Sequence, residues 1–403
     1  MKIDDKKSLK SPSLRFPEFT GEWKNTTLEE CVDFLDGQRK PIKSDDRKGE
    51  KRLYPYYGAS GIIDYIDEYI FDGDYILLSE DGANIIDRNY RVAFIANGKI
   101  WVNNHAHVLQ PHKEMNINFL SEALERINYA IYNTGTTMPK LNQEICRKIN
   151  LNVPSLSEQN KIGNLLYLLN ERIATQNGLI EDLKKLRCAI IENVFCSPNH
   201  NESALRFKGN TDPLSTYRME DFCSRITRKN KDNQCSLVLT IAAQYGLVDQ
   251  ESFFNKTVAS ENLAGYYLLH KGEFAYNRSY SAGYDWGAVK RLEKYPEGVL
   301  STLYICFKID ESAVDSDYLA YYFESTKWHK GLSDIAGEGA RNHGLLNVSV
   351  NDYFNTRHRF HCMREQKIIA SMLNVISQKE NDEIALYDNY QKQKQYLLRK
   401  MFI

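Results

Sequence analysis

One pattern occurs twice in this chain and strongly limits what it can fold into. A Glu-Gln pair leads into a long segment whose apolar residues recur every three or four positions. The first copy reads SEQNKIGNLLYLLNERI from Ser157 to Ile173, and the second reads REQKIIASMLNVISQK from Arg364 to Lys379. Such spacing places a narrow apolar seam along one side of a helix, which is the pattern of helices that pair lengthwise.

The two copies align without gaps over Glu158–Phe195 and Glu365–Phe402, and both keep the seam. At about 1.5 Å per residue, each predicted helix is roughly 57 Å long. The simplest arrangement is an antiparallel pair within one chain. The alternative is two unrelated amphipathic helices, each packed on its own domain. The residues expected to pair the helices are Ile162, Leu166, Leu169, Ile173, Leu183 and Ile190 in the first copy, and Ile369, Leu373, Ile376, Tyr390 and Leu397 in the second.

The starts of the two helices differ. Ser155-x-x-Glu158 predicts a capping box, in which each side chain bonds the backbone N–H of the other residue. The second copy has Cys362 in place of the serine, so its start is less well defined. Polar Gln176 and Glu383 interrupt the two seams at aligned positions. Polar residues at such positions can fix the register of paired helices.

The segments before the helices also correspond, so the chain reads as two copies of one unit. Leu14–Glu30 begins with Leu-Arg-Phe, as Leu205–Asp221 does, and Cys196–Ala204 has the composition of a linker. The predicted organisation is an N-terminal extension (1–13), a globular domain (14–153), a long helix (154–197), a linker (198–204), a second globular domain (205–356) and a second long helix (357–403).

Each globular part combines strands and helices. Short β-rich runs at Asp74–Ser79, Arg91–Ala96 and His107–Pro111 are separated by Gly, Asn and Asp residues typical of turns. Helices are predicted at Asn118–Asn133 and Asp317–Leu332. The fold class is therefore α+β, with two mixed α/β domains in a pseudo-twofold internal repeat. Each domain has a largely antiparallel sheet and is followed by a long helix, and the two helices pair as an antiparallel coiled coil.

Composition limits the cellular compartment that we expect for this chain and the kinds of site that it could contain. Among 403 residues there are eight Cys, without a C-x-x-C pair, which favours reduced buried thiols over a zinc ribbon or a redox site. No apolar run is long enough to cross a bilayer, and no apolar signal segment opens the sequence. We therefore expect no membrane contact and a cytoplasmic location. The formal net charge is −1, so a polyanion could bind only through local basic segments.

The sequence contains no convincing catalytic centre. It has no Pro-Pro dipeptide of the kind that follows Asn or Asp in base-methylating enzymes. Gly98-Lys99 lacks the hydroxyl residue that follows in a phosphate-binding loop. His105 and His107 are expected to hydrogen-bond at a loop or strand end rather than hold a metal, and Glu80-Asp81 is interpreted as turn chemistry. We therefore expect a non-catalytic chain without a metal site.

Two globular parts, each followed by a long helix that starts with Glu-Gln, resemble the specificity subunit of type I restriction-modification systems (the HsdS family). The resemblance spans nearly the whole chain. In the second half, EGARNHGLLN (Glu338–Asn347) replaces one of its motifs, which weakens transfer of individual residues there. The motifs that carry it are LNVPSLSEQNKIGNLLYLLNERI (Leu151–Ile173), YPYYGASGIIDYID (Tyr54–Asp67), GDYILLSEDGANI (Gly73–Ile85) and TGTTMPKLN (Thr134–Asn142).

The resemblance implies that each globular part is a target recognition domain that reads one half of a split, asymmetric site in double-stranded DNA. The paired helices would set the distance between the half-sites, and their seam residues would also offer docking surface to two methyltransferase subunits. Those partners would bind S-adenosylmethionine and methylate adenine. Restriction and translocase subunits would join them and use ATP with Mg²⁺. This chain would need no cofactor of its own.

Phosphates are bound by Lys and Arg, and base edges are read by amide, hydroxyl and guanidinium groups. In the first domain these groups concentrate in the basic segment Gly37–Arg52, in the tyrosine-rich run after it and in the Thr-rich loop before the helix. A solvated basic loop, buried tyrosines and a structural turn explain the same residues equally simply. The candidates are Arg39, Lys40, Lys43, Arg47, Lys48, Tyr57, Ser60, Thr136, Thr137 and Lys140.

In the second domain, Arg225–Lys231 takes the place of the first basic segment, and Tyr276–Trp286 and Ala340–Gly344 are expected loops. The favoured pairings of Arg with guanine and Asn with adenine do not reveal which base a given residue meets. The candidates are Arg225, Arg228, Lys229, Lys231, Asn277, Arg278, Ser279, Tyr280, Arg341, Asn342 and His343.

Other classes of function remain open at this stage. One is a stand-alone regulator whose duplicated domains bind a two-part operator, although the near-zero net charge argues mildly against it. Another is a non-catalytic coiled-coil adaptor that binds no nucleic acid. A third is an enzyme whose site the sequence does not reveal. Binding to DNA, measured with and without methyltransferase subunits, would separate these classes.

Overall fold

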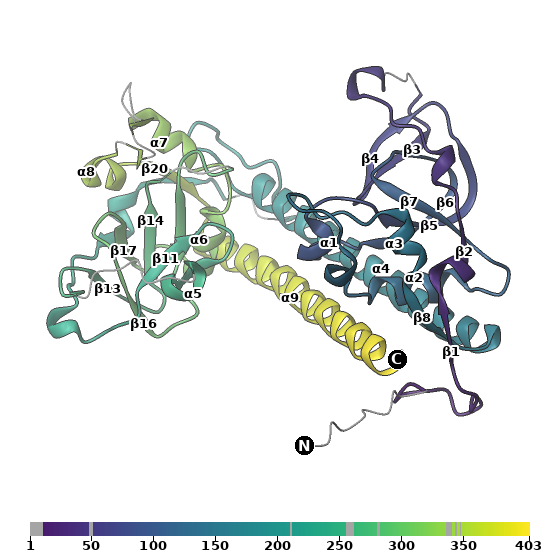
Figure 1. The fold of residues 1–403 in the computed structure, drawn as a ribbon. Coiled ribbons are helices and arrows are strands. Elements are labelled where there is room, and N and C mark those ends of the chain that lie inside the picture. The colour runs from purple at the N-terminus through teal and green to yellow at the C-terminus, as the bar shows by residue number, and fades with distance from the viewer. Residues whose placement is uncertain are drawn as a thin grey trace, which may run out of the picture. The chain divides into compact units, whose positions relative to one another are not determined.

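The structure is a computed structural model (Figure 1). It describes residues 11–47, 51–209, 212–254, 262–279, 283–335, 341–342, 345–346 and 348–403. The chain forms two compact units: unit 1 comprises Met1–Gly178 and Ala385–Ile403, and unit 2 comprises Leu179–Ile384. Each unit therefore contains one globular part together with a portion of both long helices.

The globular part of unit 1 is built on a six-stranded sheet. All neighbouring strands are antiparallel except β3 and β6, which are parallel. A separate pair, β1 (Lys24–Thr27) with β8 (Asn150–Val153), joins the start of the domain to its end. The order of the large sheet is β2 (Val32–Phe34), β7 (Ala106–Pro111), β5 (Phe71–Ser79), β6 (Ala93–Val102), β3 (Tyr54–Gly58) and β4 (Gly61–Ile66). The helices are α1 (Asn84–Asp87), α2 (Ile117–Glu125) and α3 (Gln143–Arg147), with 3-10 turns at Leu28–Glu30, Asp36–Gln38, Ser44–Asp46 and Tyr129–Tyr132.

The core of unit 1 lies between this sheet and helix α2. Ile76 and Leu78 of β5 are fully buried together with Leu120 and Leu124 of α2. Burying an aliphatic side chain of this size contributes roughly 1.5–3 kcal/mol to stability. The three predicted β-rich runs fall in strands: Asp74–Ser79 lies within β5, Arg91–Ala96 overlaps the start of β6 and His107–Pro111 lies within β7.

Unit 2 repeats the central part of this sheet. Its four-stranded sheet has the order β10 (Cys223–Arg225), β17 (Ile305–Ile309), β14 (Phe274–Asn277) and β15 (Ala288–Arg291). The two-stranded pairs are β11 (Leu239–Ala242) with β12 (Gly246–Asp249), β13 (Tyr267–His270) with β16 (Glu297–Leu300), β18 (Arg341–Asn342) with β19 (Leu345–Leu346), and β9 (Ser215–Arg218) with β20 (Arg357–Phe360). The helices are α5 (Gln250–Phe254), α6 (Ser316–Tyr322), α7 (His329–Ile335) and α8 (Val350–Phe354), with 3-10 turns at Met219–Asp221 and Lys231–Asn233.

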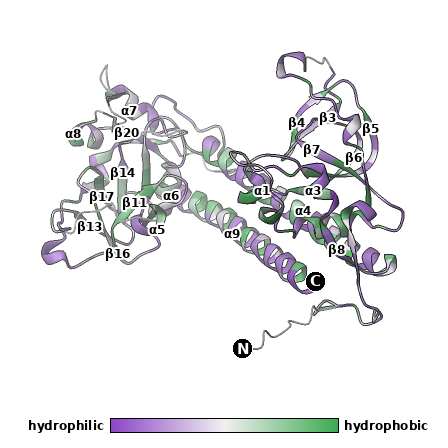
Figure 2. Cartoon of the chain, in the orientation of Figure 1, coloured by the Kyte–Doolittle hydropathy of each residue, from purple (hydrophilic) through white to green (hydrophobic). Residues whose placement is uncertain are grey.

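The two long helices pair antiparallel within each unit. These are α4 (Leu156–Val194) and α9 (Met363–Lys400). In unit 1, Ile162 and Leu166 near the start of α4 pack with Leu398 of α9. In unit 2, Ile369 near the start of α9 packs with Ile191 near the end of α4. Figure 2 shows hydrophobic and hydrophilic residues alternating along α9. All eleven predicted seam residues are buried or half-buried, so the predicted pairing and fold class are confirmed.

An aromatic residue closes each helix end in the same way. Phe402, just beyond α9, stacks on Phe119 of α2 with ring centroids 5.1 Å apart. Phe195, just beyond α4, contacts Tyr318 of α6 at 5.0 Å. Phe195 and Phe402 are aligned in the sequence repeat, and each packs on the short helix of its own unit. The identity of these two residues thus reflects the same packing site built twice.

The Glu-Gln pair at each helix start ties the helix to its globular part. Glu158 accepts two hydrogen bonds from Arg15, and Glu365 accepts two from Arg206. The neighbouring glutamine accepts the backbone N–H of the residue that caps the short helix. Gln159 bonds Asn116 N at 2.9 Å, and Gln366 bonds Asp315 N at 2.8 Å. The repeated pair is thus explained by two contacts that recur in both units.

The start of the repeat also meets the end of a long helix in both units. In unit 1 the N–H of Leu14 donates to the carbonyl of Lys400 at 2.8 Å. In unit 2 the N–H of Leu205 donates to the carbonyl of Asn193 at 2.9 Å. Lys400 and Asn193 are aligned positions of the two helices, so the two junctions are equivalent.

Two local predictions were wrong. The predicted helix Asn118–Asn133 is divided, because α2 ends at Glu125 and the side chain of Asn128 caps a separate 3-10 turn by accepting from Ala130 N. Its counterpart in unit 2 is likewise divided into α6 and α7. The capping box is only half formed. The N–H of Glu158 donates to Ser155 Oγ at 3.4 Å, but the Glu158 carboxylate turns to Arg15 instead.

Among the described residues, no helix is long and apolar enough to cross a membrane.

Candidate functional site

Several loops of unit 1 meet at one edge of the large sheet. Strands β2 and β5 end there and β7 begins there, since Phe34 pairs with Leu109 and Ser79 pairs with Ala106. We call the segments 35–43, 80–82, 103–105 and 134–141 the loop edge of unit 1. Backbone bonds hold them together: Glu80 N to His105 O at 2.9 Å, Leu141 N to Glu80 O at 2.7 Å and Gly82 N to Pro139 O at 3.0 Å.

The turn of the β3–β4 hairpin reaches the same edge. Ser79 Oγ donates to the carbonyl of Ala59 at 2.5 Å, and the N–H of Asn103 donates to the carbonyl of Tyr57 at 3.1 Å. The structure therefore brings together the basic segment, the neighbourhood of Ser60 and the Thr-rich loop. The sequence had indicated each of these as a candidate separately.

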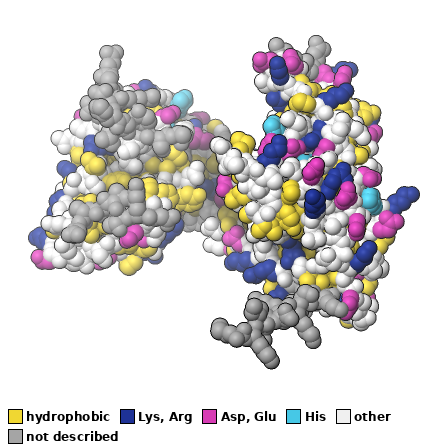
Figure 3. All heavy atoms as spheres, viewed as in Figure 1, with side chains coloured by type: hydrophobic (Ala, Val, Ile, Leu, Met, Phe, Trp, Pro, Cys, Tyr) yellow, Lys and Arg dark blue, Asp and Glu magenta, His cyan; other side chains and the backbone are white. Residues whose placement is uncertain are grey.

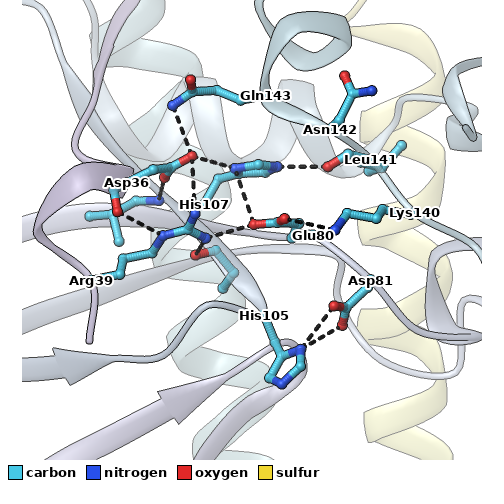
Figure 4. Close-up of polar contacts among 12 residues, drawn as sticks. Asp36, Arg39, Glu80, Asp81, His105, His107, Lys140, Leu141, Asn142 and Gln143 are labelled. Atoms are coloured by element: carbon cyan, nitrogen blue, oxygen red, sulfur yellow. Dashed lines mark hydrogen bonds and ion pairs between the residues drawn. The ribbon is translucent and has the colours of Figure 1, made fainter. Parts of the chain in front are cut away.

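A network of charged side chains lies under the loop edge (Figure 4). Glu80 accepts from Arg39 Nη1 at 2.7 Å and faces Lys140 Nζ at 3.4 Å. Asp36 pairs with His107 Nδ1 at 2.6 Å, and His107 Nε2 lies 2.8 Å from the carbonyl of Leu141. Arg39 and Lys140 are far apart in sequence but meet on one carboxylate. The network ties segments 35–43, 80–82 and 134–141 to one another and to the start of β7.

His107 is protonated in this network. Both of its ring nitrogens face acceptors, the Asp36 carboxylate and the Leu141 carbonyl, so both must donate. Burial, the largest single influence, lowers the pKa of His107, but the hydrogen bonds and charges of Asp36 and Cys146 together outweigh it and raise the pKa to about 10. Burial, again the largest single influence, raises the pKa of Asp36, but the bond and charge of His107, the Val108 N–H and the charge of Arg39 together outweigh it, so this pKa is lowered overall. The prediction that His107 hydrogen-bonds at a strand end is confirmed.

The network changes how two predictions are interpreted. The Arg39 guanidinium is largely buried and also donates to the carbonyls of Asp36 and Ala106. Its donors are therefore used within the protein, and a contact with DNA stays a prediction. The interpretation of Glu80-Asp81 as turn chemistry was wrong, since Glu80 is the centre of the ion-pair network. No local pattern indicates this role, because Arg39 and Lys140 come from distant segments.

Some of the other DNA-binding candidates of unit 1 are engaged within the protein, and others are exposed. Arg47 lies over the Tyr56 ring at 5.1 Å and faces Asp64 at 3.4 Å, so it supports the hairpin. Tyr57 is half-buried, and Lys48 lies outside the described residues. Exposed residues that remain free to meet a ligand are Lys40, Lys43, Ser60, Thr136 and Thr137, with Lys140 half exposed.

Unit 2 has a matching loop edge, where β10 and β14 end and β17 begins. We apply the name to the described residues of 226–231, 278–279, 301–304 and 345–348. The N–H of Leu346 donates to the carbonyl of Arg278 at 3.0 Å, as Leu141 does to Glu80 in unit 1. The guanidinium of Arg278 donates to the carbonyls of Val348 and Leu303 at 3.2 and 3.1 Å. Arg278 therefore holds this edge together.

The remaining candidates of unit 2 are partly engaged. Arg228 bonds Glu273 at 2.6 Å, and Lys229 bonds the carbonyl of Gly265 at 2.8 Å and lies over the Tyr267 ring. The side chain of Asn277 accepts from Ser279 N. Arg225 and Lys231 are exposed. Tyr280 and His343 lie outside the described residues. Arg341 and Asn342 form strand β18, and their side chains are not described.

The visible face of unit 1 is not uniformly basic. On the face of unit 1 seen in Figure 3, Lys and Arg side chains are interspersed with Asp and Glu. This agrees with the net charge of −1. Binding of a polyanion would depend on local groups at the loop edges and on positive surface from partners.

The first part of the chain is similar to known proteins. Residues 20–185 match the family model of the type I restriction modification DNA specificity domain. A putative type I restriction enzyme specificity subunit of Haemophilus influenzae is 35% identical over 148 residues, which are 37% of this chain and 37% of that protein. A putative type I specificity subunit of Mycoplasma pneumoniae is 29% identical over 201 residues, 48% of this chain and 51% of that one. The match thus spans about a third to a half of these relatives.

The fold as a whole resembles a solved structure. The crystal structure of the type I restriction-modification S subunit from M. genitalium superimposes with a TM-score of 0.63 over 98% of this chain and 99% of that chain. The sequence identity is 14%, so this likeness concerns the fold alone. The resemblance seen in the sequence motifs is confirmed.

Proposed function

We propose that this chain is the DNA specificity subunit of a type I restriction-modification complex, because residues 20–185 match the family model of the type I restriction modification DNA specificity domain. In this proposal the chain is not an enzyme. Each unit reads one half of a bipartite, asymmetric DNA site with its loop edge. Methyltransferase subunits bring S-adenosylmethionine, and restriction and translocase subunits bring ATP and Mg²⁺.

The observation that carries the proposal is the loop edge built twice. In unit 1 the loop with the TGTTMPKLN motif is hydrogen-bonded to the residue after β5, from the N–H of Leu141. In unit 2 the segment that replaces this motif is hydrogen-bonded to the residue after β14, from the N–H of Leu346. The side chains at the two edges differ, however. Recognition of two different half-sites requires different side chains on an equivalent backbone arrangement, and the two loop edges have both.

Docking of two methyltransferase subunits is supported by exposed aliphatic residues on the helices. The seam residues are used in pairing, so docking requires others. Leu168 on α4 and Leu386 on α9 are exposed in unit 1, and their aligned counterparts Val375 and Leu179 are exposed in unit 2. Each unit thus presents the same pair of aliphatic positions, which fits two copies of one partner.

The test is to express the chain together with the methyltransferase subunits of its system and to map methylated adenines by long-read sequencing. We expect one bipartite motif with two fixed half-sites, and strong sequence-specific DNA binding only by the assembly. Sequence-specific binding by the isolated chain that equals binding by the assembly would indicate a stand-alone regulator. No DNA binding in either state would indicate an adaptor.

A further inference from the structure

On the basis of this function, we propose that His105 reads a base edge in the half-site of unit 1, with its ring held in place by Asp81. His105 is not among the DNA-binding candidates expected from the sequence. Its position at the loop edge, its fixed backbone and its one unoccupied ring nitrogen together support it.

The backbone of His105 is held at both of its polar groups. Its N–H donates to Asn103 Oδ1 at 2.8 Å, and its carbonyl accepts from Glu80 N at 2.9 Å. The residue directly precedes β7. A side chain on such a fixed backbone loses little conformational freedom on binding, which favours a specific contact.

The imidazole of His105 is also oriented. Nδ1 lies 2.9 and 2.8 Å from the two carboxylate oxygens of Asp81 (Figure 4). Asp81 is itself held, because it forms an isolated bridge with Lys140 of the Thr-rich loop. With Nδ1 directed at Asp81, the nitrogen left for a ligand is Nε2. No other described residue forms a hydrogen bond with it, and the side chain is 49% exposed.

The chemistry of Nε2 fits the major-groove edge of a base. When Nδ1 donates to Asp81, the neutral ring presents Nε2 as an acceptor. It can then bind the exocyclic amino group of adenine or cytosine. An imidazolium would instead donate to O6 or N7 of guanine. In either state the ring presents a single directional group, as direct readout requires.

Each of the carboxylates around His105 is engaged by a neighbouring side chain. Glu80 is paired with Arg39 and Lys140, and Asp81 with His105 itself. Asp36, deeper in the edge, is paired with His107. The charges of Glu80 and Asp36 are thus matched by positive partners, and the Asp81 carboxylate is hydrogen-bonded by His105, which lowers the repulsion of a phosphate backbone at this edge.

The same strand supplies a matched control. His112 follows the other end of β7, about 20 Å away along the strand. It too faces an aspartate, with Nε2 3.3 Å from Asp33 Oδ1, and it is 34% exposed. If exposed His–Asp pairs on this sheet were only surface features, substitutions at His105 and His112 would have the same small effect.

The experiment compares complexes carrying His105→Ala, Asp81→Asn or His112→Ala by methylome sequencing and by DNA binding. We expect His105→Ala to make one base of one half-site degenerate, with the other half-site and the spacer unchanged. Binding to the original site should fall about ten- to hundredfold. Asp81→Asn should weaken the preference at the same base, and His112→Ala should change nothing.

Three outcomes would overturn the inference. The first is an unchanged methylation motif in His105→Ala, and the second is that His105→Ala and His112→Ala behave alike. The third is an equal loss of DNA binding on all sequences with a shallower salt dependence, which indicates a phosphate contact. If His105→Ala fails to fold, His105→Gln takes its place, with the same expectation. A wild-type complex that methylates no bipartite site refutes the proposed function instead, so the two failures are distinguishable.

Discussion

Arg15 and Glu158 form a bidentate ion pair, with both N–O distances 2.7 Å, and Glu158 is only 1% exposed. Arg206 and Glu365 repeat this pair in unit 2. The pair joins the first residues of each repeat to the first turn of its long helix. It therefore couples each globular part to its long helix.

Removing the arginine should strongly destabilise unit 1. Arg15→Ala leaves the Glu158 carboxylate buried without its partner, and we expect the free energy of unfolding to fall by about 3 kcal/mol. Denaturant unfolding of the whole chain measures this. In the double variant Arg15→Leu with Glu158→Leu, most of the loss should be recovered, since no charge is left buried. A loss in Arg15→Ala below about 1 kcal/mol would contradict the coupling role.

Stability should depend on pH through His107. Its pKa is about 10 in the folded chain, against an ordinary value near 6.5 when unfolded. The folded state therefore holds the proton more tightly. The resulting stabilisation is fully present below about pH 6.5 and is lost progressively as the pH rises to about 10. We expect a loss of several kcal/mol over this window in wild type. His107→Gln, measured alongside, should show a flatter profile, and equal profiles would refute the assignment.

Lys40 and Lys43 should contact phosphates. Both are exposed at the loop edge, and the carbonyl of Lys40 is fixed by Trp101 Nε1 at 2.7 Å. We expect Lys40→Ala and Lys43→Ala to weaken DNA binding by the assembly by the same factor on every sequence. Each should also reduce the salt dependence by about one unit of slope. Lys113, exposed near His112, is the control and should change neither. A change in the motif would point to base reading instead.

Leu168 and Val375 should each serve one methyltransferase subunit. They are aligned in the repeat, exposed, and belong to different units. We expect Leu168→Asp or Val375→Asp to reduce the bound methyltransferase subunits from two to one, and the double variant to bind none, as counted by native mass spectrometry. Leu186 is equally exposed but aligns with polar Gln393, so Leu186→Asp should keep both. Two bound subunits in both single variants would exclude these positions.

The length of the helices should set the spacer of the DNA site. Seven residues inserted after Gln176 and after Glu383 preserve the seam and lengthen each helix by about 10 Å. This corresponds to about three base pairs of spacer at 3.4 Å each. We expect the methylome to show both half-sites unchanged and the spacer longer by that amount. An unchanged spacer would remove the helices from any role in measuring distance.

Local periodicity was sufficient to predict the long helices and their pairing. The seam residues Ile162 and Ile369 are buried as expected, because a three-four spacing has one simple structural solution. The Glu-Gln pair indicates the helix starts in the sequence, but the residues that it contacts are not predictable from the local pattern. Glu158 bonds Arg15 from far upstream, and that choice displaced the expected capping box.

The loop edge was predictable only in parts. Its segments were each identified from composition, but their meeting depends on the pairing of β5 with β7, which no local pattern reveals. The burial of Arg39 follows from that pairing, because it brings Glu80 and the Ala106 carbonyl within reach of the guanidinium. The roles of Glu80 and His107 likewise arise from contacts between distant residues. Composition therefore located the site, and long-range pairing decided which side chains remain free.

The two junctions, Leu14 with Lys400 and Leu205 with Asn193, make the order of the halves along the gene arbitrary. A circularly permuted chain that begins at Leu205 and has the present ends joined would keep both junctions and both globular parts. Under the proposed function, exchanging one half for that of a relative at these joints would change one half-site of the DNA target and leave the other unchanged.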